Sequence, residues 1–443
     1  MAVSTMRAVL ALLLLLAAVP ARAQDDAERL RIHGSYTMGQ ALVPALVEDW
    51  LRTLDYRQIR RVPRAQGVLE IHASRDGEPL VVEIAGRGAA AGFAALVDGR
   101  SELAMLTRPP TARERDAGWQ LGDLDSPDQQ FLVALNAARV VVHRDNPLQR
   151  IDVAQLRALL AGQARDWGAL GGRGGAVRVH LGPPGGGLDG FLRERLGHEL
   201  RPAALQRHPG LRAAAAAVAR DPGALAVVEL GTPLPPGVRA LAVSDGGLAV
   251  APDTTGIRSQ DYPLAWRYQV YGGQMMSALG RSFALHTLGA SAQRVVSAQG
   301  LVPMGLVAPA GPAPDVAALP GPYREAVAGA VRLPVTLRFN LGSLTTVFEG
   351  SSAQDLERLA AWLQRPENRG RSLSVVGFAQ EDPASRLFAM TTSANRADIV
   401  AEWLIRRGIP VQRSRGLGPL RPLAGGSGEE ARFRNERVEL WLL

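Results

Sequence analysis

The segment that most constrains the fold is residues 81–111, which predicts a strand, a glycine loop, a helix and a second strand. Gly86 and Gly88 interrupt the first apolar run, and alanines at helical spacing follow them. A glycine turn that leads into a helix presents free backbone N–H groups and the positive end of the helix dipole. The loop is therefore either an anion-binding loop or an ordinary connection, and the ordinary connection is the commoner case.

A second junction of this kind precedes it in the chain. Residues 32–50 predict a short strand, a Gly-Ser-Tyr-Thr-Met-Gly turn and an amphipathic helix. Ser35 or Thr37 can cap that helix through its side-chain oxygen. Two helix N-termini thus follow predicted strands in the first quarter of the chain.

A third junction lies at residues 176–196, where a strand leads through Gly182-Pro-Pro-Gly-Gly-Gly187 into a helix from about Asp189. It is not a nucleotide P-loop, because Leu188 and Asp189 stand where that motif needs Lys and Ser or Thr. Strands and helices alternate through this whole region, which predicts α/β layers.

Length and composition limit the class of protein. At 443 residues the chain is too long for one core, so two to three domains are expected. The absence of cysteine excludes disulfides, thiolate metal sites and cysteine nucleophiles. Arginine supplies every fixed basic side chain of a net charge of +8, but the arginines are scattered and aromatic residues are only 5%. This distribution argues against nucleic acid as a partner.

The first 23 residues predict a secretory signal peptide. Arg7 precedes an apolar run at 9–19, and Ala21-Arg22-Ala23 matches an A-x-A cleavage site. No cysteine follows that site, which argues against a lipid-anchored form, and no later apolar run approaches the roughly 20 residues of a spanning helix. We expect an exported mature protein without a transmembrane segment.

No catalytic motif stands out in the sequence. The seven histidines show no H-E-x-x-H or other metal spacing, and no G-x-S-x-G elbow is present. We therefore expect a binding protein with no metal and no cofactor, and not an enzyme.

Short motifs follow one another in a fixed order along residues 31–306. They are Gly34-Ser-Tyr-Thr-Met38, Gly86-Arg-Gly88, Ala104-Met-Leu-Thr-Arg-Pro109, Asn146-Pro147 with Leu156, Gly162 and Trp167, Asp221-Pro-Gly-Ala224, Tyr262-Pro-Leu264 and Ala298-Gln-Gly-Leu-Val-Pro303. In this order the motifs resemble the periplasmic phosphate-binding proteins of ABC importers. The resemblance implies a type II periplasmic-binding fold at 24–306, in which two α/β lobes are joined by crossings near 130–136 and 228–234.

The resemblance also implies a ligand site at helix N-termini in the cleft between the lobes, an oxyanion such as phosphate as ligand, and an ABC importer as partner. The implied site residues are Thr37, Met38, Arg87, Gly88, Ala89, Ala90, Arg108, Gly185, Gly186 and Gly187. The second and third loops lack the hydroxyl and Arg contacts usual in the family. Each hydrogen bond to a charged ligand contributes about 1.5–3 kcal/mol, so we expect phosphate to bind more weakly than is usual in that family.

The last part of the chain predicts a separate unit. Residues 307–332 are rich in Pro and Ala, which is typical of a linker. Residues 333–443 then predict a small β-α-β-α-β domain with strands at 335–339, 372–377 and 437–442 and helices at 352–363 and 393–406.

This unit also carries motifs in a characteristic order. They are Phe339-Asn-Leu-Gly-Ser343, Val376-Gly377, Thr392-Ser393-x-x-Arg396-Ala397, Leu404 with Gly408-Ile409, Gly416-Leu-Gly418 with Pro422, and Asn435-Glu-Arg-Val-Glu439. The set resembles the OmpA-like peptidoglycan-binding family. The resemblance implies that an Asp and the helix Arg hold a diaminopimelate residue.

Arg396 matches the Arg of that site, and its planar fork suits a bidentate carboxylate contact. The Asp position falls on Gln380 or on Glu381, depending on the direction of counting, and Ala389 stands where Asn is usual. A ligand with an ammonium group needs an acidic partner, so we expect Glu381 opposite Arg396.

Two functions stay open at this point. The first is a periplasmic solute-binding protein for phosphate or a related oxyanion, which its C-terminal domain tethers to peptidoglycan. The second is a cell-envelope scaffold with a degenerate cleft that acts through protein or peptidoglycan contacts.

Overall fold

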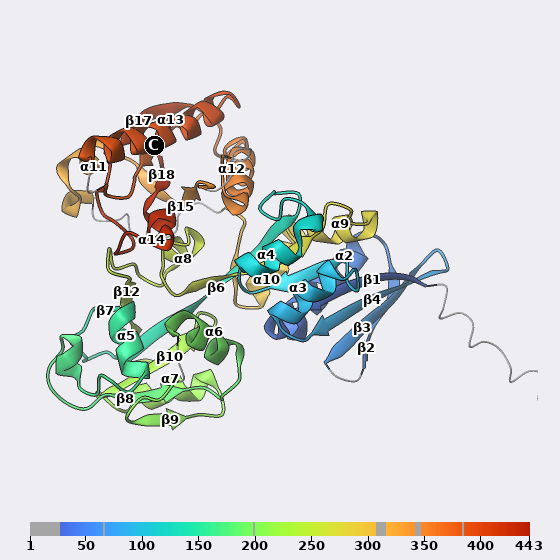
Figure 1. Ribbon diagram of the computed structural model, residues 1–443, viewed down its shortest axis with the longest axis horizontal. Helices are drawn as coiled ribbons and strands as arrows, with labels where there is room; N and C mark the ends of the chain where they lie inside the picture. Colours follow the sequence, from blue (N-terminus) through green and yellow to red (C-terminus); the bar gives the residue numbers. More distant parts are fainter. Residues whose placement is uncertain (1–26, 65–66, 198–199, 307–315, 342–346, 383–384) are drawn as a thin grey trace, which may run out of the picture.

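The computed structural model describes residues 27–64, 67–197, 200–306, 316–341, 347–382 and 385–443. The predicted signal peptide, residues 307–315 of the predicted linker, and Gly342 and Ser343 lie outside the described residues. Figure 1 shows two α/β lobes on either side of one long strand, with the C-terminal domain against their junction. None of the helices in the described part of the chain has the length and apolar character needed to cross a membrane.

The first lobe is a mixed sheet with helices packed on it. Its strands are β1 (Glu28–Gly34), β2 (Arg57–Pro63), β3 (Val68–Arg75), β4 (Glu78–Gly86) and β5 (Leu103–Leu106). Its helices are η1 (Met38–Leu42), α2 (Val43–Thr53), α3 (Ala89–Val97), α4 (Ala112–Ala117), η2 (Trp119–Leu121), α9 (Ala278–His286) and α10 (Ala290–Ala298). β1 pairs in parallel with both β4 and β5, so the carboxyl ends of these three strands lie at the same edge of the sheet.

The amphipathic pattern of α2 explains its position. Leu46, Val47 and Trp50 are fully buried or nearly so, at the i, i+1 and i+4 spacing of one helix face. The Trp50 ring packs edge-on against Phe283 of α9 at 5.5 Å, and its indole N–H donates to Ser282 at 3.1 Å. The predicted helix thus joins two parts of the first lobe that are far apart in the sequence.

The second lobe repeats the α/β arrangement. Its elements are β7 (Arg150–Asp152), α5 (Val153–Leu160), η3 (Trp167–Leu170), β8 (Arg178–Leu181), α6 (Gly187–Leu196), β9 (Leu205–Arg207), α7 (Leu211–Val218), β10 (Ala224–Glu229), β11 (Val238–Ala240) and β12 (Ala242–Ser244). β8, β9 and β10 are parallel, and the side of β10 away from β8 pairs with the long central strand.

The central strand β6 (Gln130–His143) belongs to both lobes. Its first part pairs with β13 (Ala265–Gly272) of the first lobe, and its second part pairs with β10 of the second lobe. β14 (Val302–Pro303) also pairs with it. One continuous twelve-stranded sheet results, and the first predicted crossing lies on this strand.

The return crossing differs from the expected one near 228–234. After β10 the chain stays with the second lobe, because β11 pairs with the end of β6 and β12 pairs with β7. It returns to the first lobe through α8 (Thr254–Arg258) and then β13. Residues 228–234 lie beside the central strand β6 and do not lead into the first lobe. The Leu230 N–H donates to the Ala137 carbonyl of β6 at 2.9 Å.

A second local difference concerns residues 281–299, which the apolar spacing predicts as one helix. The structure has two, α9 and α10, separated near Gly289. Gly289 has an extended backbone, with φ −75° and ψ 160°, and is the N-cap of α10. Hydrophobic spacing continues across this break, so the pattern alone does not reveal it.

The C-terminal domain has a four-stranded sheet in the order β15-β18-β16-β17. Its elements are η4 (Val316–Ala318), α11 (Gly321–Ala326), β15 (Val331–Arg338), α12 (Gly350–Leu363), β16 (Leu373–Gly377), α13 (Arg386–Ile405), β17 (Val411–Gly416), α14 (Glu429–Asn435) and β18 (Arg437–Leu442). The predicted fold class is confirmed, with β17 and α14 in addition. β17 is an edge strand with two arginines and no apolar run, so its sequence signal is weak.

The part of the predicted linker that the structure describes packs into this domain. Tyr323 of α11 is 4% exposed, and its ring lies 5.4 Å from Phe378 and 5.9 Å from Trp441. Its hydroxyl donates to the Glu439 carboxylate. Residues 316–326 therefore cover one face of the C-terminal sheet, so this stretch is not a free linker.

A buried ion pair fixes the C-terminal domain to the crossing between the lobes. Asp355 of α12 accepts two hydrogen bonds from Arg258 of α8, at 2.7 and 2.9 Å, and both side chains are at most 3% exposed. Arg358 adds a third contact to the same carboxylate at 2.8 Å. These bonds outweigh the effect of burial and hold the pKa of Asp355 below its ordinary value.

A second carboxylate, Asp261, anchors β15 to the same crossing. It accepts hydrogen bonds from Arg338 at 3.0 Å, from the Thr336 hydroxyl at 3.0 Å and from Arg332 at 3.3 Å. Arg338 also donates to the carbonyls of Ser259 and Gln260, each at 3.1 Å. Side chains on one face of β15 thus bind the turn at residues 259–261 of the lobe pair.

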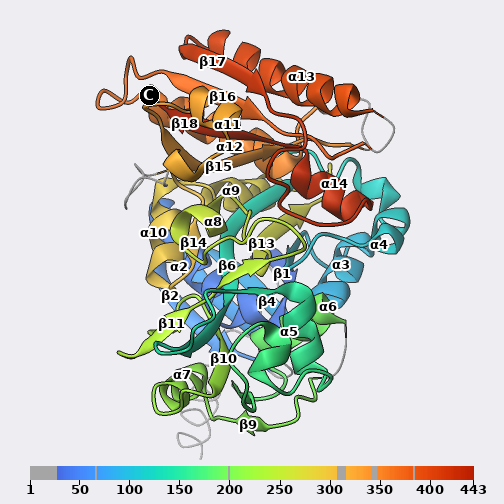
Figure 2. The same cartoon turned by 90° about the vertical axis from the view of Figure 1, so that its left-hand side faces the viewer.

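The two ends of the C-terminal domain contact different lobes. Arg434 of α14 pairs with Asp245 of the second lobe at 2.6 Å, and Arg195 of α6 pairs with the same carboxylate at 2.9 Å. At the start of α12, Glu349 pairs with Arg267 of β13 at 2.6 Å. In Figure 2 the domain lies above both lobes, with α14 extending towards them.

We predict that Asp355→Ala destabilises the whole molecule, because it leaves the buried Arg258 without its carboxylate. Removing one partner of a buried ion pair costs about 3–5 kcal/mol. Chemical denaturation of the mature protein measures this loss. Glu357→Gln is the matched control on the same helix, because its pair with Arg407 is exposed and should change stability by no more than about 0.5 kcal/mol. Equal effects of both substitutions would contradict the anchoring role.

Candidate functional site

The first helix junction is capped by Ser35. Its hydroxyl accepts from the Met38 N–H at 3.4 Å, and its carbonyl accepts from the Gly39 N–H at 3.0 Å. Thr37 has helical dihedrals and lies inside the first turn, so it is not the cap. Met38 is fully buried in the lobe core, so its side chain faces away from the cleft surface.

The second junction uses much of its backbone within the first lobe. The N–H groups of Arg87 and Gly88 both donate to the Gly34 carbonyl, at 2.9 and 2.8 Å. Gly88 has φ +100° and begins α3, where only glycine is free of strain. The Arg87 side chain is exposed, and Ala89 and Ala90 form the first helical turn, whose N–H groups have no partner within the helix.

The third junction already contains a negative charge. Gly186 is the N-cap of α6, and the buried Asp189 in its first turn accepts from the Gly185 N–H at 3.3 Å. Asp189 also pairs with Arg193 and with Arg207, each at 2.8 Å. Although burial favours the neutral acid, these bonds keep the pKa of Asp189 below its ordinary value. A carboxylate of the chain itself therefore sits at this helix end.

The first and third junctions meet across the cleft. A Cβ atom at Gly187 would lie 2.6 Å from the Thr37 hydroxyl, so the two lobes are in contact at this point. The second junction lies next to the first, because a Cβ at Gly86 would be 3.4 Å from Tyr36 Cα. The structure thus brings together the three helix N-termini, and a ligand between Thr37 and Gly187 requires the lobes to move apart.

Arg108, the remaining predicted site residue, lies farther along the cleft and is paired. Its guanidinium donates twice to Glu114, at 2.7 and 2.8 Å, and lies 3.7 Å from Glu194 of the second lobe. The hydrogen bonds from Arg108 lower the pKa of Glu114 to about 2. Arg108 therefore links the lobes but has little uncompensated charge to offer an anion.

The three acidic residues of the cleft were not among the sequence-predicted site residues. The position of Glu114 could have been predicted from the sequence, because Thr111 and Glu114 form a capping box at the start of α4. Glu194 and Asp189 lie on α6, whose position opposite Arg108 follows from lobe packing and not from local sequence.

A pair of histidines in contact through their ring nitrogens lies beside the third loop. His180 of β8 and His208 face each other with 2.9 Å between ring nitrogens, and His180 is 5% exposed. Burial first, and the neighbouring His208 second, lower the pKa of His180, with Arg178 adding to this and Asp221 opposing it. The folded lobe thus favours the neutral ring.

We predict that His180 makes the protein less stable in mild acid. The unfolded chain protonates this ring near the ordinary pKa of about 6.5, whereas the folded lobe protonates it only at lower pH. The unfolded state therefore binds more protons, and stability falls as the pH drops through 6.5 towards the lowered pKa. Thermal unfolding between pH 8 and 5 should show a shallower slope for His180→Asn than for the unmodified protein. Identical slopes would contradict the prediction.

In the C-terminal domain, Arg396 of α13 has an internal partner. It pairs with Glu436, which also accepts from Arg432 at 2.8 Å, and its guanidinium lies 4.7 Å from the centre of the Phe339 ring. The side chain is 12% exposed, and burial lowers its pKa. Its Nη1 has no hydrogen-bond partner among the described residues, so one donor of the fork is unused.

The two candidates for an acid opposite Arg396 have other positions. The Gln380 amide accepts from Asn435 at 2.6 Å and donates to the Gly426 carbonyl at 3.1 Å, so it holds a loop. Glu381 is exposed on the chain after β16. The structure gives Arg396 a different acidic neighbour, Glu436, because the turn between α14 and β18 folds back onto α13.

Comparison with known families assigns both parts of the chain. A family model described as a PBP superfamily domain matches residues 65–285, and a model of the OmpA family matches residues 339–436. The chain therefore carries a domain of the PBP superfamily followed by a domain of the OmpA family. The fusion predicted from the two motif sets is confirmed.

Individual relatives match one part each. The chain is 32% identical over 114 residues to "Probable lipoprotein YiaD" of Escherichia coli (strain K12), covering 25% of this chain and 50% of that protein. The chain thus spans about half the length of this relative. Among solved structures, an ABC-type phosphate transport receptor from Vibrio cholerae is 18% identical, with a TM-score of 0.48, over 62% of this chain and 99% of that one. PstS from Borrelia burgdorferi is 15% identical, also with a TM-score of 0.48, over 62% and 98%.

Proposed function

We propose that this protein is a solute-binding protein of the cell envelope, located in the periplasm, whose lobes bind phosphate or a related oxyanion. The observation that carries the proposal is the convergence of three helix N-termini where Thr37 meets Gly187. Helix N-termini present N–H donors and positive dipole ends to an anion. The PBP superfamily domain supports a binding role and not an enzymatic one, and an ABC importer is the corresponding partner.

A scaffold function is the second candidate, and the charge of the cleft favours it. Arg108 is neutralised by Glu114, and Asp189 already occupies the N-terminus of α6. An incoming oxyanion must therefore compete with two carboxylates of the chain. In this case the lobes would serve as a contact surface for envelope proteins.

We predict that Glu114→Gln strengthens phosphate binding and that Arg108→Ala abolishes it. Gln retains the capping box with Thr111 while it releases the guanidinium from its carboxylate. Calorimetric titration with phosphate and thermal unfolding in its presence measure both effects, since a ligand at 100 times its dissociation constant stabilises by about 2.7 kcal/mol. Glu78→Gln, an exposed charge change in the same lobe, is the control.

The same titration separates the two functions. Binding of phosphate that follows the order Glu114→Gln, unmodified protein, Arg108→Ala supports the solute-binding proposal. If neither the unmodified protein nor Glu114→Gln responds to any oxyanion at millimolar concentration, the scaffold is the better account.

We further propose that the OmpA family domain binds peptidoglycan through Arg396, with Glu381 accepting the ammonium of a diaminopimelate residue. The unused donor of Arg396 supports a carboxylate contact. Glu436 is already shared between Arg396 and Arg432, so an exposed Glu381 is the freer acceptor.

We predict that Arg396→Ala and Glu381→Ala each remove binding of the mature protein to isolated sacculi at low salt. Gln380→Ala should leave most of the binding, and Glu436→Gln should increase it because it frees the guanidinium. Pull-down with sacculi measures all four variants. Because aggregated protein also sediments, each variant is spun in parallel without sacculi. An unmodified protein that stays in the supernatant with sacculi would overturn the anchoring role.

A further inference from the structure

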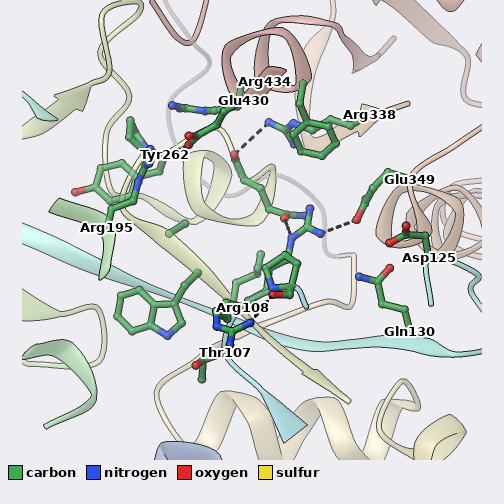
Figure 3. A pocket seen from close by; sticks show the side chains of 18 of the residues that line it. Thr107, Arg108, Asp125, Gln130, Arg195, Tyr262, Arg338, Glu349, Glu430 and Arg434 are labelled. Carbon is green, nitrogen blue, oxygen red and sulfur yellow. Dashed lines mark hydrogen bonds and ion pairs between the residues drawn. The ribbon is translucent and has the colours of Figure 1, made fainter. Parts of the chain in front are cut away.

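A cavity of about 640 Å³ lies where the two lobes and the C-terminal domain meet. Figure 3 shows side chains from all three parts around it, among them Arg108, Arg195 and Arg434. Its volume falls within the roughly 300–1,000 Å³ of small-molecule sites. Arg108 is the one residue predicted for the oxyanion that the described lining of this cavity includes.

The charge balance of this cavity is unlike that of an anion site. Six arginines line it, at positions 108, 115, 195, 267, 338 and 434, together with four carboxylates, Asp125, Glu194, Glu349 and Glu430. Three further carboxylates, Glu114, Asp245 and Asp261, pair with lining arginines from behind. Asp261 is shared with a further arginine, Arg332, so seven acids face seven guanidinium groups and the charges balance. Each lining guanidinium has an acidic partner.

Three lining side chains have acceptor oxygens with unused hydrogen-bonding capacity. Glu194 has one distant contact, 3.7 Å from Arg108, and its side chain is 62% exposed. Glu430 contacts Arg195 through one oxygen at 2.9 Å and is 70% exposed. Each carboxylate can accept about four hydrogen bonds. At the inner end, Gln130 is 3% exposed, and its Oε1 has no donor among the described residues.

The remaining walls are apolar and aromatic. Phe191 of α6 and Trp266 of β13 stack with 4.4 Å between ring centres, and both line the cavity with Leu135 and Phe433. Aromatic faces attract a cation as well as an apolar body. A ligand that fits these walls carries a hydrogen-bond donor with a positive charge and an apolar part.

We propose that this cavity is a binding site for a small organic amine. Its ammonium group is attracted by the exposed carboxylates of Glu194 and Glu430, and its apolar body lies against Phe191 and Trp266. Because the site is built from both lobes and the C-terminal domain, such an amine binds only the docked arrangement of the three parts and stabilises it.

Titration of the full mature protein with phenethylamine and with 3-phenylpropionate tests the proposal. The two probes share the ring and the two-carbon chain and differ in the sign of the terminal charge. We expect the amine to bind and to raise the unfolding temperature, and the carboxylate to do neither. Binding of both probes alike, or of neither at millimolar concentration and low salt, would overturn the proposal.

Two exposed substitutions locate the site. Glu194→Gln and Glu430→Gln should each weaken phenethylamine binding about tenfold, because each removes a charge-assisted contact. Glu367→Gln, an exposed change outside the cavity, should leave binding unchanged. Since these side chains are exposed, the unliganded variants should unfold at the temperature of the unmodified protein, and an affinity that is the same in all three variants would refute the assigned site.

Discussion

The buried carboxylates Asp355 and Asp261 are the interactions on which the arrangement of this molecule depends. Asp355 receives two hydrogen bonds from Arg258 of the lobe pair in addition to its contact with Arg358 of its own helix, and Asp261 is held by arginines of the C-terminal domain. Both carboxylates therefore lose charged partners if the C-terminal domain is not docked. Burial of an unpaired charge is strongly unfavourable, whereas a paired and hydrogen-bonded charge is tolerated. These contacts favour one docking geometry more than they add stability, because several hydrogen bonds must form together.

Docking of the C-terminal domain constrains the lobes themselves. α12 contacts the first lobe and the central strand, and α14 contacts the second lobe through Asp245. A rotation of one lobe against the other would therefore disturb one of these two sets of contacts. Separation of the lobes at the Thr37–Gly187 contact and the position of the OmpA family domain are therefore physically linked in this architecture.

The cleft between the lobes and the Arg396 region of the C-terminal domain share one electrostatic feature. In both, the arginine predicted to bind a ligand is paired with a carboxylate of the chain itself. Arg108 pairs with Glu114 in the cleft, and Arg396 pairs with Glu436 in the C-terminal domain. A ligand must replace these carboxylates or approach the donors that they leave unused. Under the proposed function, this competition lowers the affinity for simple anions, and a substitution that removes one of the carboxylates raises it.

Sequence alone determined the α/β class, the two motif-defined domains, and elements with strong local signals such as α2. The helix predicted at 393–406 begins earlier in the structure, since α13 spans Arg386–Ile405. The sequence also placed the three glycine junctions at helix N-termini, because capping and periodicity are local properties. The tertiary structure alone decided that the chain returns through α8, that Glu194 faces Arg108, and that Glu436 pairs with Arg396. These outcomes depend on how the two lobes and the C-terminal domain pack against one another. Arg258 and Asp355, for example, form a buried ion pair only when that packing removes both side chains from water.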